Sequence, residues 1–184
     1  MKITILDGNP EKDRTGFYRY LNELVTGLQS DKHQVKTLTL RDMEIKFCTG
    51  CWSCWWGPTP GECVFKDESH TLCREYINSD FVIFASPVIL GFTSALLKKT
   101  QDKLIPLLHP YIELVQGECH HKKRYDRYPG IGLILDTNSD TDEEDITVTT
   151  DMFHRFALNL KTELAFSLLT DQPVAEVQDA INRI

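Results

Sequence analysis

The stretch that decides the fold is residues 80–92, which read DFVIFASPVILGF. Its first part, residues 81–85, is a short and continuous apolar run, which is typical of a strand buried on both faces of a parallel sheet. A helical pattern follows at about 93–108. Because ligands of open α/β sheets bind at the carboxyl ends of the strands, residues 86–92 are expected to line a ligand crevice. An ordinary strand–helix connection is an equally open alternative at this point.

The composition is that of a globular chain, with 184 residues of which 41% are hydrophobic and 26% charged. This length favours one domain, so we expect residues 1–184 to fold as a unit. The net charge of −7 argues against a general nucleic-acid or anionic-membrane surface. We expect no transmembrane helix and no signal peptide. Six cysteines in such a chain indicate a reducing compartment, the cytoplasm.

Four further strands are predicted from apolar and β-branched runs, at 2–6, 33–40, 131–136 and 164–169. Helical periodicity is expected at about 17–28, 68–78, 93–108, 146–160 and 174–181, whereas 111–130 reads as an irregular, locally basic loop. Five strands that alternate with five helices predict a doubly wound α/β domain. Without a Gly-rich dinucleotide fingerprint, we expect a flavodoxin-like three-layer sandwich. Its five-stranded parallel sheet has the order 2-1-3-4-5, with helices on both faces.

In that order the switch point lies between the first and third strands, so the loops after residues 6 and 85 face each other. The first of these loops, residues 8–16, enters a helix whose first turn contains Thr15 and Gly16. Free backbone N–H groups and the positive end of the helix dipole can seat a phosphate there. The loop carries no P-loop motif. A phosphate seat beside an apolar loop suits a flat ring with a phosphorylated tail, and FMN meets that description.

The two loops also resemble those of a known family. DGNP at 7–10 and ASPVILG at 85–91 look like the NADPH-dependent FMN reductase family, a flavodoxin-like group of NAD(P)H-dependent oxidoreductases. The run FCTGCWSCW at 47–55, followed by PGEC at 60–63, is similar to the branch that includes the iron–sulfur flavoproteins. The resemblance spans nearly the whole chain.

The resemblance implies an FMN site built from three loops. The first loop would hold the phosphate and ribityl chain, the second would frame the isoalloxazine, and the third would close the other side of the ring. The first loop departs from the family's common Ser-Pro-Arg form. It has Asn9 where serine is usual and Glu11 where a basic residue is. The implied FMN residues are Gly8, Asn9, Pro10, Thr15, Gly16 and Phe17, then Pro87, Val88, Ile89, Gly91 and Phe92, then Thr137 and Asn138.

A Cys-rich loop at about 46–67 carries Cys48, Cys51, Cys54 and Cys63. Four thiolates at this spacing can wrap a [4Fe–4S] cluster. An all-thiolate zinc site is a second interpretation, although zinc knuckles usually present two Cys-x2-Cys pairs. A third is a metal-free loop whose cysteines and tryptophans roof the flavin. The gap between Cys54 and Cys63 is longer than in the iron–sulfur flavoproteins, and all three interpretations stay open.

Together these features predict an FMN-dependent NAD(P)H oxidoreductase. It would pass hydride from NAD(P)H to the flavin and on to a quinone, a flavin or another small-molecule acceptor. The flavin carries this chemistry, so we assign no catalytic acid, base or nucleophile. One alternative is an iron–sulfur flavoprotein that carries electrons between FMN, a [4Fe–4S] cluster and ferredoxin-like partners. Another is a flavin-free flavodoxin-fold binding module. Because a flavin crevice at the end of one domain is shallow, we expect a homodimer or homotetramer to cover it.

Overall fold

The computed structural model describes all residues from 1 to 184, and its central sheet has the predicted strand order. Five parallel strands lie side by side in the order β2-β1-β3-β7-β8. Counted along the chain, these are the first to fifth parallel strands, so the flavodoxin-like order 2-1-3-4-5 is confirmed. Their bounds are Lys2–Asp7 for β1, Gln34–Thr39 for β2, Phe81–Ile89 for β3, Gly130–Asp136 for β7 and Leu164–Leu169 for β8.

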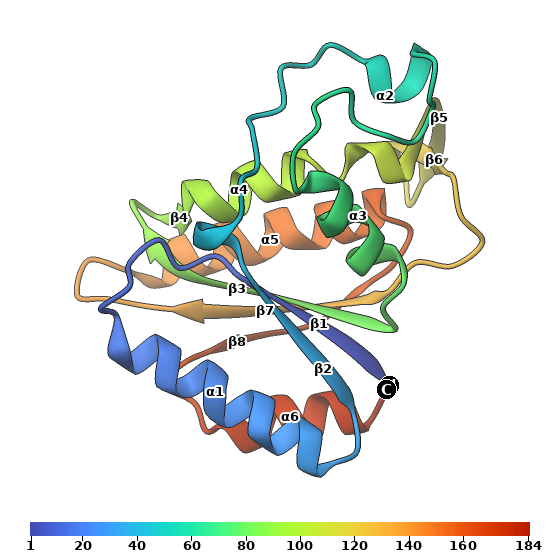
Figure 1. Cartoon of the computed structure of the whole chain (residues 1–184). Helices are drawn as coiled ribbons and strands as arrows, with labels where there is room; N and C mark the ends of the chain where they lie inside the picture. Colours follow the sequence, from blue (N-terminus) through green and yellow to red (C-terminus); the bar gives the residue numbers. More distant parts are fainter.

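Helices cover both faces of the sheet, which gives the molecule three layers (Figure 1). Helices α1 (Thr15–Ser30) and α6 (Val174–Asn182) lie on one face. The opposite face carries α3 (Ser69–Ile77), α4 (Ala95–Asp102) and α5 (Glu143–Asn159). The shorter pieces are η1 (Leu40–Asp42), α2 (Ser53–Trp56) and η2 (Ile105–Leu107). No helix combines the length and the apolar character needed to cross a membrane.

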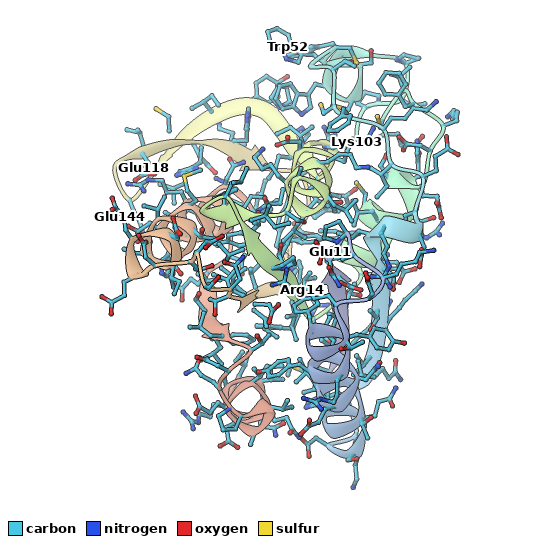
Figure 2. The ribbon with its side chains drawn as sticks, turned by 90° about the vertical axis from the view of Figure 1, so that its left-hand side faces the viewer. Glu11, Arg14, Trp52, Lys103, Glu118 and Glu144 are labelled. Atoms are coloured by element: carbon cyan, nitrogen blue, oxygen red, sulfur yellow. The ribbon has the colours of Figure 1, made fainter.

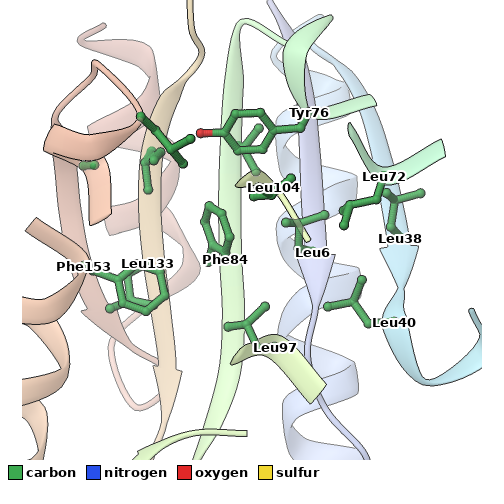
Figure 3. Packing of buried hydrophobic residues seen from close by; sticks show 14 of the residues in the cluster. Leu6, Leu38, Leu40, Leu72, Tyr76, Phe84, Leu97, Leu104, Leu133 and Phe153 are labelled. Carbon is green, nitrogen blue, oxygen red and sulfur yellow. The ribbon is translucent and has the colours of Figure 1, made fainter. Parts of the chain in front are cut away.

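Strand β3 is apolar throughout because its side chains alternate between two separate cores. Phe81 and Ile83 pack with α1 and α6, whereas Val82 and Phe84 pack with the helices of the other face. Figure 3 shows Phe84 at the centre of that second core. Its ring centroid lies 5.5 Å from that of Phe153 in α5. The continuous apolar run is therefore the mark of a strand with no solvent-facing side.

The segment after this strand differs from the expected loop. Strand β3 continues to Ile89, and its last residues pair antiparallel with β4 (Phe92–Thr93). The turn between them holds Leu90 and Gly91, both with positive φ, at 51° and 75°. Residues 86–92 are thus a strand end and a hairpin rather than an open connection. The last residues of β3 extend beyond the parallel sheet, where no neighbouring parallel strand can pair with them. Their backbone groups pair with β4 instead.

The helix expected at 93–108 is shorter than predicted, since α4 ends at Asp102. Pro106 follows, and its ring cannot continue an α-helix, so the chain forms the short η2 instead. The irregular loop expected at 111–130 is wrong for residues 111–123, where strands β5 (Leu108–Val115) and β6 (Glu118–Lys123) form an antiparallel hairpin. Its turn residues, Gln116 and Gly117, both have positive φ, as a two-residue hairpin turn requires. Residues 124–129 are irregular, as expected.

Candidate functional site: three loops at the carboxyl edge

The structure brings the three predicted loops together at one edge of the sheet. The Gly8 N–H donates to the Ala85 carbonyl at 2.8 Å, which joins the first loop to β3. The Asn138 side chain donates from Nδ2 to the Val88 carbonyl at 3.2 Å, which joins the third loop to the hairpin. Helix α4 adds a further tie, because the Ser94 hydroxyl donates to the Gly8 carbonyl. The topology alone therefore placed these loops correctly.

The first loop is held in shape by Asn9, which is only 2% exposed. Its Nδ2 donates to the Glu11 carbonyl at 2.8 Å, and its Oδ1 accepts from the Glu11 N–H at 3.0 Å. The Asn9 N–H in turn donates to Asp7 Oδ1 at 3.0 Å. Both polar atoms of the Asn9 side chain are therefore used in hydrogen bonds within the loop. Pro10, next to it, is exposed.

The start of α1 is open to an anion. No side chain caps it, and no acidic residue lies in its first turn. The first N–H groups of a helix have no partner within the helix. A Cβ built on Gly16 would meet no atom within 4 Å, so the space beside this turn is free. Thr15 and Gly16 are exposed, whereas the Phe17 side chain is buried in the core and can offer a ligand only its backbone.

The charges around this seat partly cancel. Arg14 Nε lies 2.6 Å from Asp136 Oδ2, and its Nη1 lies 4.0 Å from Glu11 Oε2. Figure 2 shows Glu11 and Arg14 next to each other beside α1. Arg41 Nη1 lies 3.1 Å from Asp7 Oδ2. Burial raises the pKa of Asp7 and outweighs the Asn9 N–H and the Arg41 charge, which lower it. A phosphate at the start of α1 would meet the Arg14 guanidinium, which already pairs with the carboxylates of Asp136 and Glu11.

The β3–β4 hairpin forms an apolar lip above the edge. Leu90 is fully exposed, Ile89 is 36% exposed, and Phe92 is half-buried. Gly91 is required at its position, because its φ is +75° and a Cβ there would lie 2.6 Å from Asp145 Oδ1. Sequence reasoning missed Leu90, although it stood between two residues that were assigned to the flavin.

The other predicted residues of the second and third loops play supporting roles. Pro87 and Val88 are buried within β3, and the Val88 side chain packs in the core rather than facing a ligand. Asn138 Oδ1 accepts from the Asp140 N–H at 2.8 Å, which shapes the third loop. Thr137, beside it, is half-buried. An open helix start, an apolar lip and exposed backbone at one edge fit a flat ring with a phosphorylated tail.

A cavity of about 610 Å³ lies beside this edge, between the Cys-rich loop, α4 and α5. It shares only Phe92 with the predicted flavin residues. Its lining is mostly hydrophobic, with Trp55, Phe65 and Phe156 among its aromatic members. All four cysteines of the loop line it, namely Cys48, Cys51, Cys54 and Cys63.

A buried ion pair stands at the base of the Cys-rich loop. Lys103, 2% exposed, points its Nζ to within 3.1 Å of Cys63 Sγ and 3.3 Å of Asp67 Oδ2. Burial would raise the pKa of Asp67, but hydrogen bonds from Ser69 and the Lys46 N–H, together with the Lys103 charge, lower it to about 2. Sequence reasoning missed this pair, since Lys103 stood on an otherwise apolar helical pattern.

The four cysteines are not arranged as a ligand set. No three His, Cys, Asp or Glu side chains gather in a metal-binding group anywhere in the chain. Cys48 and Cys51 are exposed, while Cys54 and Cys63 are half-buried. Because no three of these side chains gather around one point, the donors do not fit a [4Fe–4S] cluster or a zinc ion as they stand.

Comparisons with known proteins find curated relatives that are named iron–sulfur flavoproteins. An iron–sulfur flavoprotein from Archaeoglobus fulgidus is 31% identical over 109 residues, which cover 59% of this chain and 48% of that protein. An iron–sulfur flavoprotein from Methanocaldococcus jannaschii is 26% identical over 107 residues, covering 58% of this chain and 53% of that protein. The chain therefore spans about half the length of the curated relatives it matches.

Solved structures share the fold at low sequence identity. A FMN-dependent NADH-azoreductase from Bacillus anthracis, in complex with FMN, has a TM-score of 0.65 at 12% identity and covers 100% of this chain and 95% of its own. The NAD(P)H:quinone oxidoreductase from Methanothermobacter marburgensis has a TM-score of 0.65 at 14% identity and covers 99% and 96%. The sequence profile described as NADPH-dependent FMN reductase matches residues 1–117. The chain belongs to the NADPH-dependent FMN reductase family.

Proposed function

We propose that this chain is an FMN-dependent NAD(P)H oxidoreductase, with residues 1–184 as one FMN-binding domain. The observation that carries the proposal is the meeting of three loops at the carboxyl edge of the sheet, beside an open helix start, in a chain of this family. A bound flavin would supply the chemistry, accepting hydride from NAD(P)H and returning it to an acceptor. The protein positions both reactants.

The residues divide this work between them. The N–H groups of Gly16 and Phe17 would hold the phosphate, because the first turn of α1 is uncapped and unobstructed. The Thr15 N–H donates to the Asp13 carbonyl at 2.8 Å, so Thr15 would offer its hydroxyl instead. Gly8, Asn9 and Pro10 would fix the loop along which the ribityl chain runs, since Asn9 locks its shape. This division explains how a loop without the usual serine can still serve.

The hairpin would frame the ring from the other side. Ile89 and Phe92 supply apolar cover, Gly91 lets the backbone come close, and Pro87 and Val88 hold the strand end rigid. Thr137 and Asn138 would close the third side. A quinone, a flavin or another small acceptor would then take the place that the nicotinamide leaves. We expect a second copy of the chain, in a homodimer or homotetramer, to cover the apolar lip.

Flavin binding and reduction test the proposal. Protein stripped of flavin should bind FMN more tightly than riboflavin, because only FMN carries the phosphate for the α1 seat. Flavin-loaded protein should lose its flavin absorbance on anaerobic addition of NADPH or NADH. Equal affinity for the two flavins would contradict the phosphate seat, and a flavin that stays oxidised would contradict the oxidoreductase. A chain that binds neither flavin would instead be a flavin-free binding module.

A second candidate function is an iron–sulfur flavoprotein that carries electrons to and from ferredoxin-like partners. Two observations favour it: the curated relatives bear that name, and four cysteines line one cavity. Binding of a [4Fe–4S] cluster would require the loop to rearrange so that its thiolates gather around one centre. Iron and acid-labile sulfide in protein purified without air, with a broad brown absorbance, would support this candidate over the first.

A further inference from the structure

The Cys-rich loop carries a pair of thiols with contrasting surroundings. We propose that Cys51 and Cys54 form a redox-active dithiol that exchanges with disulfide substrates. The proposal starts from a disagreement, since the relatives are named for an iron–sulfur centre whereas these four thiols do not gather as ligands.

The backbone presents Cys51 at a sharp turn. Its neighbours Gly50 and Trp52 both have left-handed conformations, with φ of 64° and 58°. For tryptophan this conformation is unfavourable, because its Cβ crowds the carbonyl oxygen, so the surrounding contacts must hold it. The Trp52 carbonyl does so by accepting from the N–H groups of Trp55 and Trp56, at 2.9 and 3.0 Å. Such strain gathers at functional sites, and here it leaves the Cys51 side chain exposed.

Cys54 lies in the first turn after this bend, in the short helix α2, and is half-buried. Its carbonyl accepts from the Gly61 N–H at 2.7 Å, so its backbone is fixed to the far side of the loop. The Cys-x2-Cys spacing thus joins an exposed thiol to a shielded one. An exposed thiol can attack an incoming disulfide, and a shielded one can resolve the product without being attacked first.

The other cysteines have different surroundings. Cys63 is engaged by Lys103, and the half-buried Cys73 donates from Sγ to the Lys103 carbonyl at 3.3 Å. Cys119 is exposed, but it lies on β6, in a separate hairpin. Cys48 is exposed and stands three residues before Cys51, so it is the natural rival for the attacking role. The assignment to Cys51 rests on its place between two left-handed residues next to α2.

The exchange proceeds in two balanced steps. The Cys51 thiolate attacks one sulfur of a disulfide RSSR, which forms a Cys51–S–S–R bond and releases RS⁻. The Cys54 thiolate then attacks Cys51 Sγ, which forms the Cys51–Cys54 disulfide and releases the second RS⁻. Two protons pass from the protein thiols to the two RS⁻ groups, so RSSR is reduced to two RSH. Return to the dithiol takes a hydride from NAD(P)H, which brings two electrons and one proton, and a second proton from water, and it rests on the proposed function. The exchange itself needs no flavin.

The exposed aromatic residues indicate where a disulfide would approach. Trp52 and Trp56 are each 62% exposed; Trp52 lies between the two cysteines in the sequence, and Trp56 lies two residues after Cys54. Figure 2 shows Trp52 at the outer end of the molecule, far from the start of α1. The thiols can therefore meet a substrate without passing the flavin edge. A small disulfide and a protein disulfide share the reacting S–S bond, so both serve as probes.

The test uses the full chain, reduced with dithiothreitol and then freed of it. The protein is exposed to glutathione disulfide or to insulin, and its thiols are blocked with iodoacetamide and mapped by mass spectrometry. We expect a Cys51–Cys54 disulfide after treatment with glutathione disulfide, with insulin, or with each of them. Cys54→Ser should stop at a mixed disulfide on Cys51, and Cys51→Ser should form neither product. Cys119→Ser, which removes another exposed thiol, is the matched control and should react like the unaltered protein.

Several results would overturn the proposal. Unreacted thiols with both probes would do so, as would a disulfide between Cys48 and Cys54, or a Cys51→Ser variant that still reacts. Iron and labile sulfide that are lost on Cys51→Ser would show that the thiol is a ligand instead. The thiol–disulfide exchange uses neither NAD(P)H nor flavin. Its failure is therefore distinct from a failure of the proposed oxidoreductase activity, which the bleaching of the flavin by NAD(P)H tests separately.

Discussion

The substitution Lys103→Met removes a buried cation and leaves its partner carboxylate behind. The side chains of Lys103 and Asp67 are only 1% and 0% exposed, with Nζ and Oδ2 3.3 Å apart. Breaking a buried pair by deleting one partner costs about 3–5 kcal/mol. Here Ser69 and the Lys46 N–H still bond to the carboxylate. We therefore expect a loss near the lower limit, about 3 kcal/mol, or roughly 6–12 °C in Tm for a chain of this length.

Helix α4, which ends just before Lys103, provides the control variant. Lys98 pairs with Asp102 at the surface, where the two side chains are 47% and 50% exposed. Lys98→Met should cost no more than about 0.5 kcal/mol, because solvent screens such pairs. The free energy of unfolding is measured for both variants by urea denaturation. If Lys103→Met and Lys98→Met destabilise the protein equally, the buried pair does not contribute as the structure indicates.

The pH dependence gives an independent check of this pair. The pKa of Asp67 is lowered from 3.8 to about 2 in the folded chain. A lowered folded-state pKa means that the stabilisation is complete above 3.8 and is lost as the pH falls toward about 2. The gap corresponds to about 2 kcal/mol. Asp67→Asn should flatten the stability curve between those pH values, and an unchanged slope there would refute the assignment.

Three further predictions concern the core and the first two loops. Gly91→Ala should destabilise the chain by about 2 kcal/mol, through the positive φ and the displacement of Asp145 from the cap of α5, and should weaken FMN binding in a fluorescence titration. Asn9→Ala deletes two hydrogen bonds to Glu11 and should cost about 1–3 kcal/mol in urea, with a larger loss of affinity for FMN than for riboflavin. Tyr76→Phe removes a fully buried hydroxyl without a partner and should leave stability unchanged or raise it by about 1 kcal/mol; a clear loss would reveal a hidden hydrogen bond.

The sheet could be predicted because each buried strand is a continuous apolar run. Residues 81–85 belong to both cores, as expected of a strand that helices cover on both faces. Strand order followed from the alternation of strands and helices, and the meeting of the three loops followed from that order. The pattern of apolar residues in a sequence therefore indicates well which side chains are buried on the faces of the central sheet.

The missed features depend on contacts that periodicity does not report. The β5–β6 hairpin exposes Ile112 and Leu114, at 52% and 74%, so its residues show no buried face from which strands could be inferred. In the sequence, Lys103 looks like a surface lysine. Only the fold shows that it contacts Asp67 and Cys63, which lie in the Cys-rich loop about 40 residues earlier in the chain. The role of Asn9 was hidden in the same way, because a residue that shapes its own loop has the same signature as one that binds a ligand.

Helix α4 touches the surroundings of both proposed centres, one at each end. At its start, the Ser94 hydroxyl bonds to the carbonyl of Gly8 in the first loop. Just past its end, Lys103 bonds to Cys63 in the Cys-rich loop. Eight helical residues form a rod about 12 Å long, too stiff to absorb a small displacement. Helix α4 therefore connects the first loop and the Cys-rich loop through one short, rigid element.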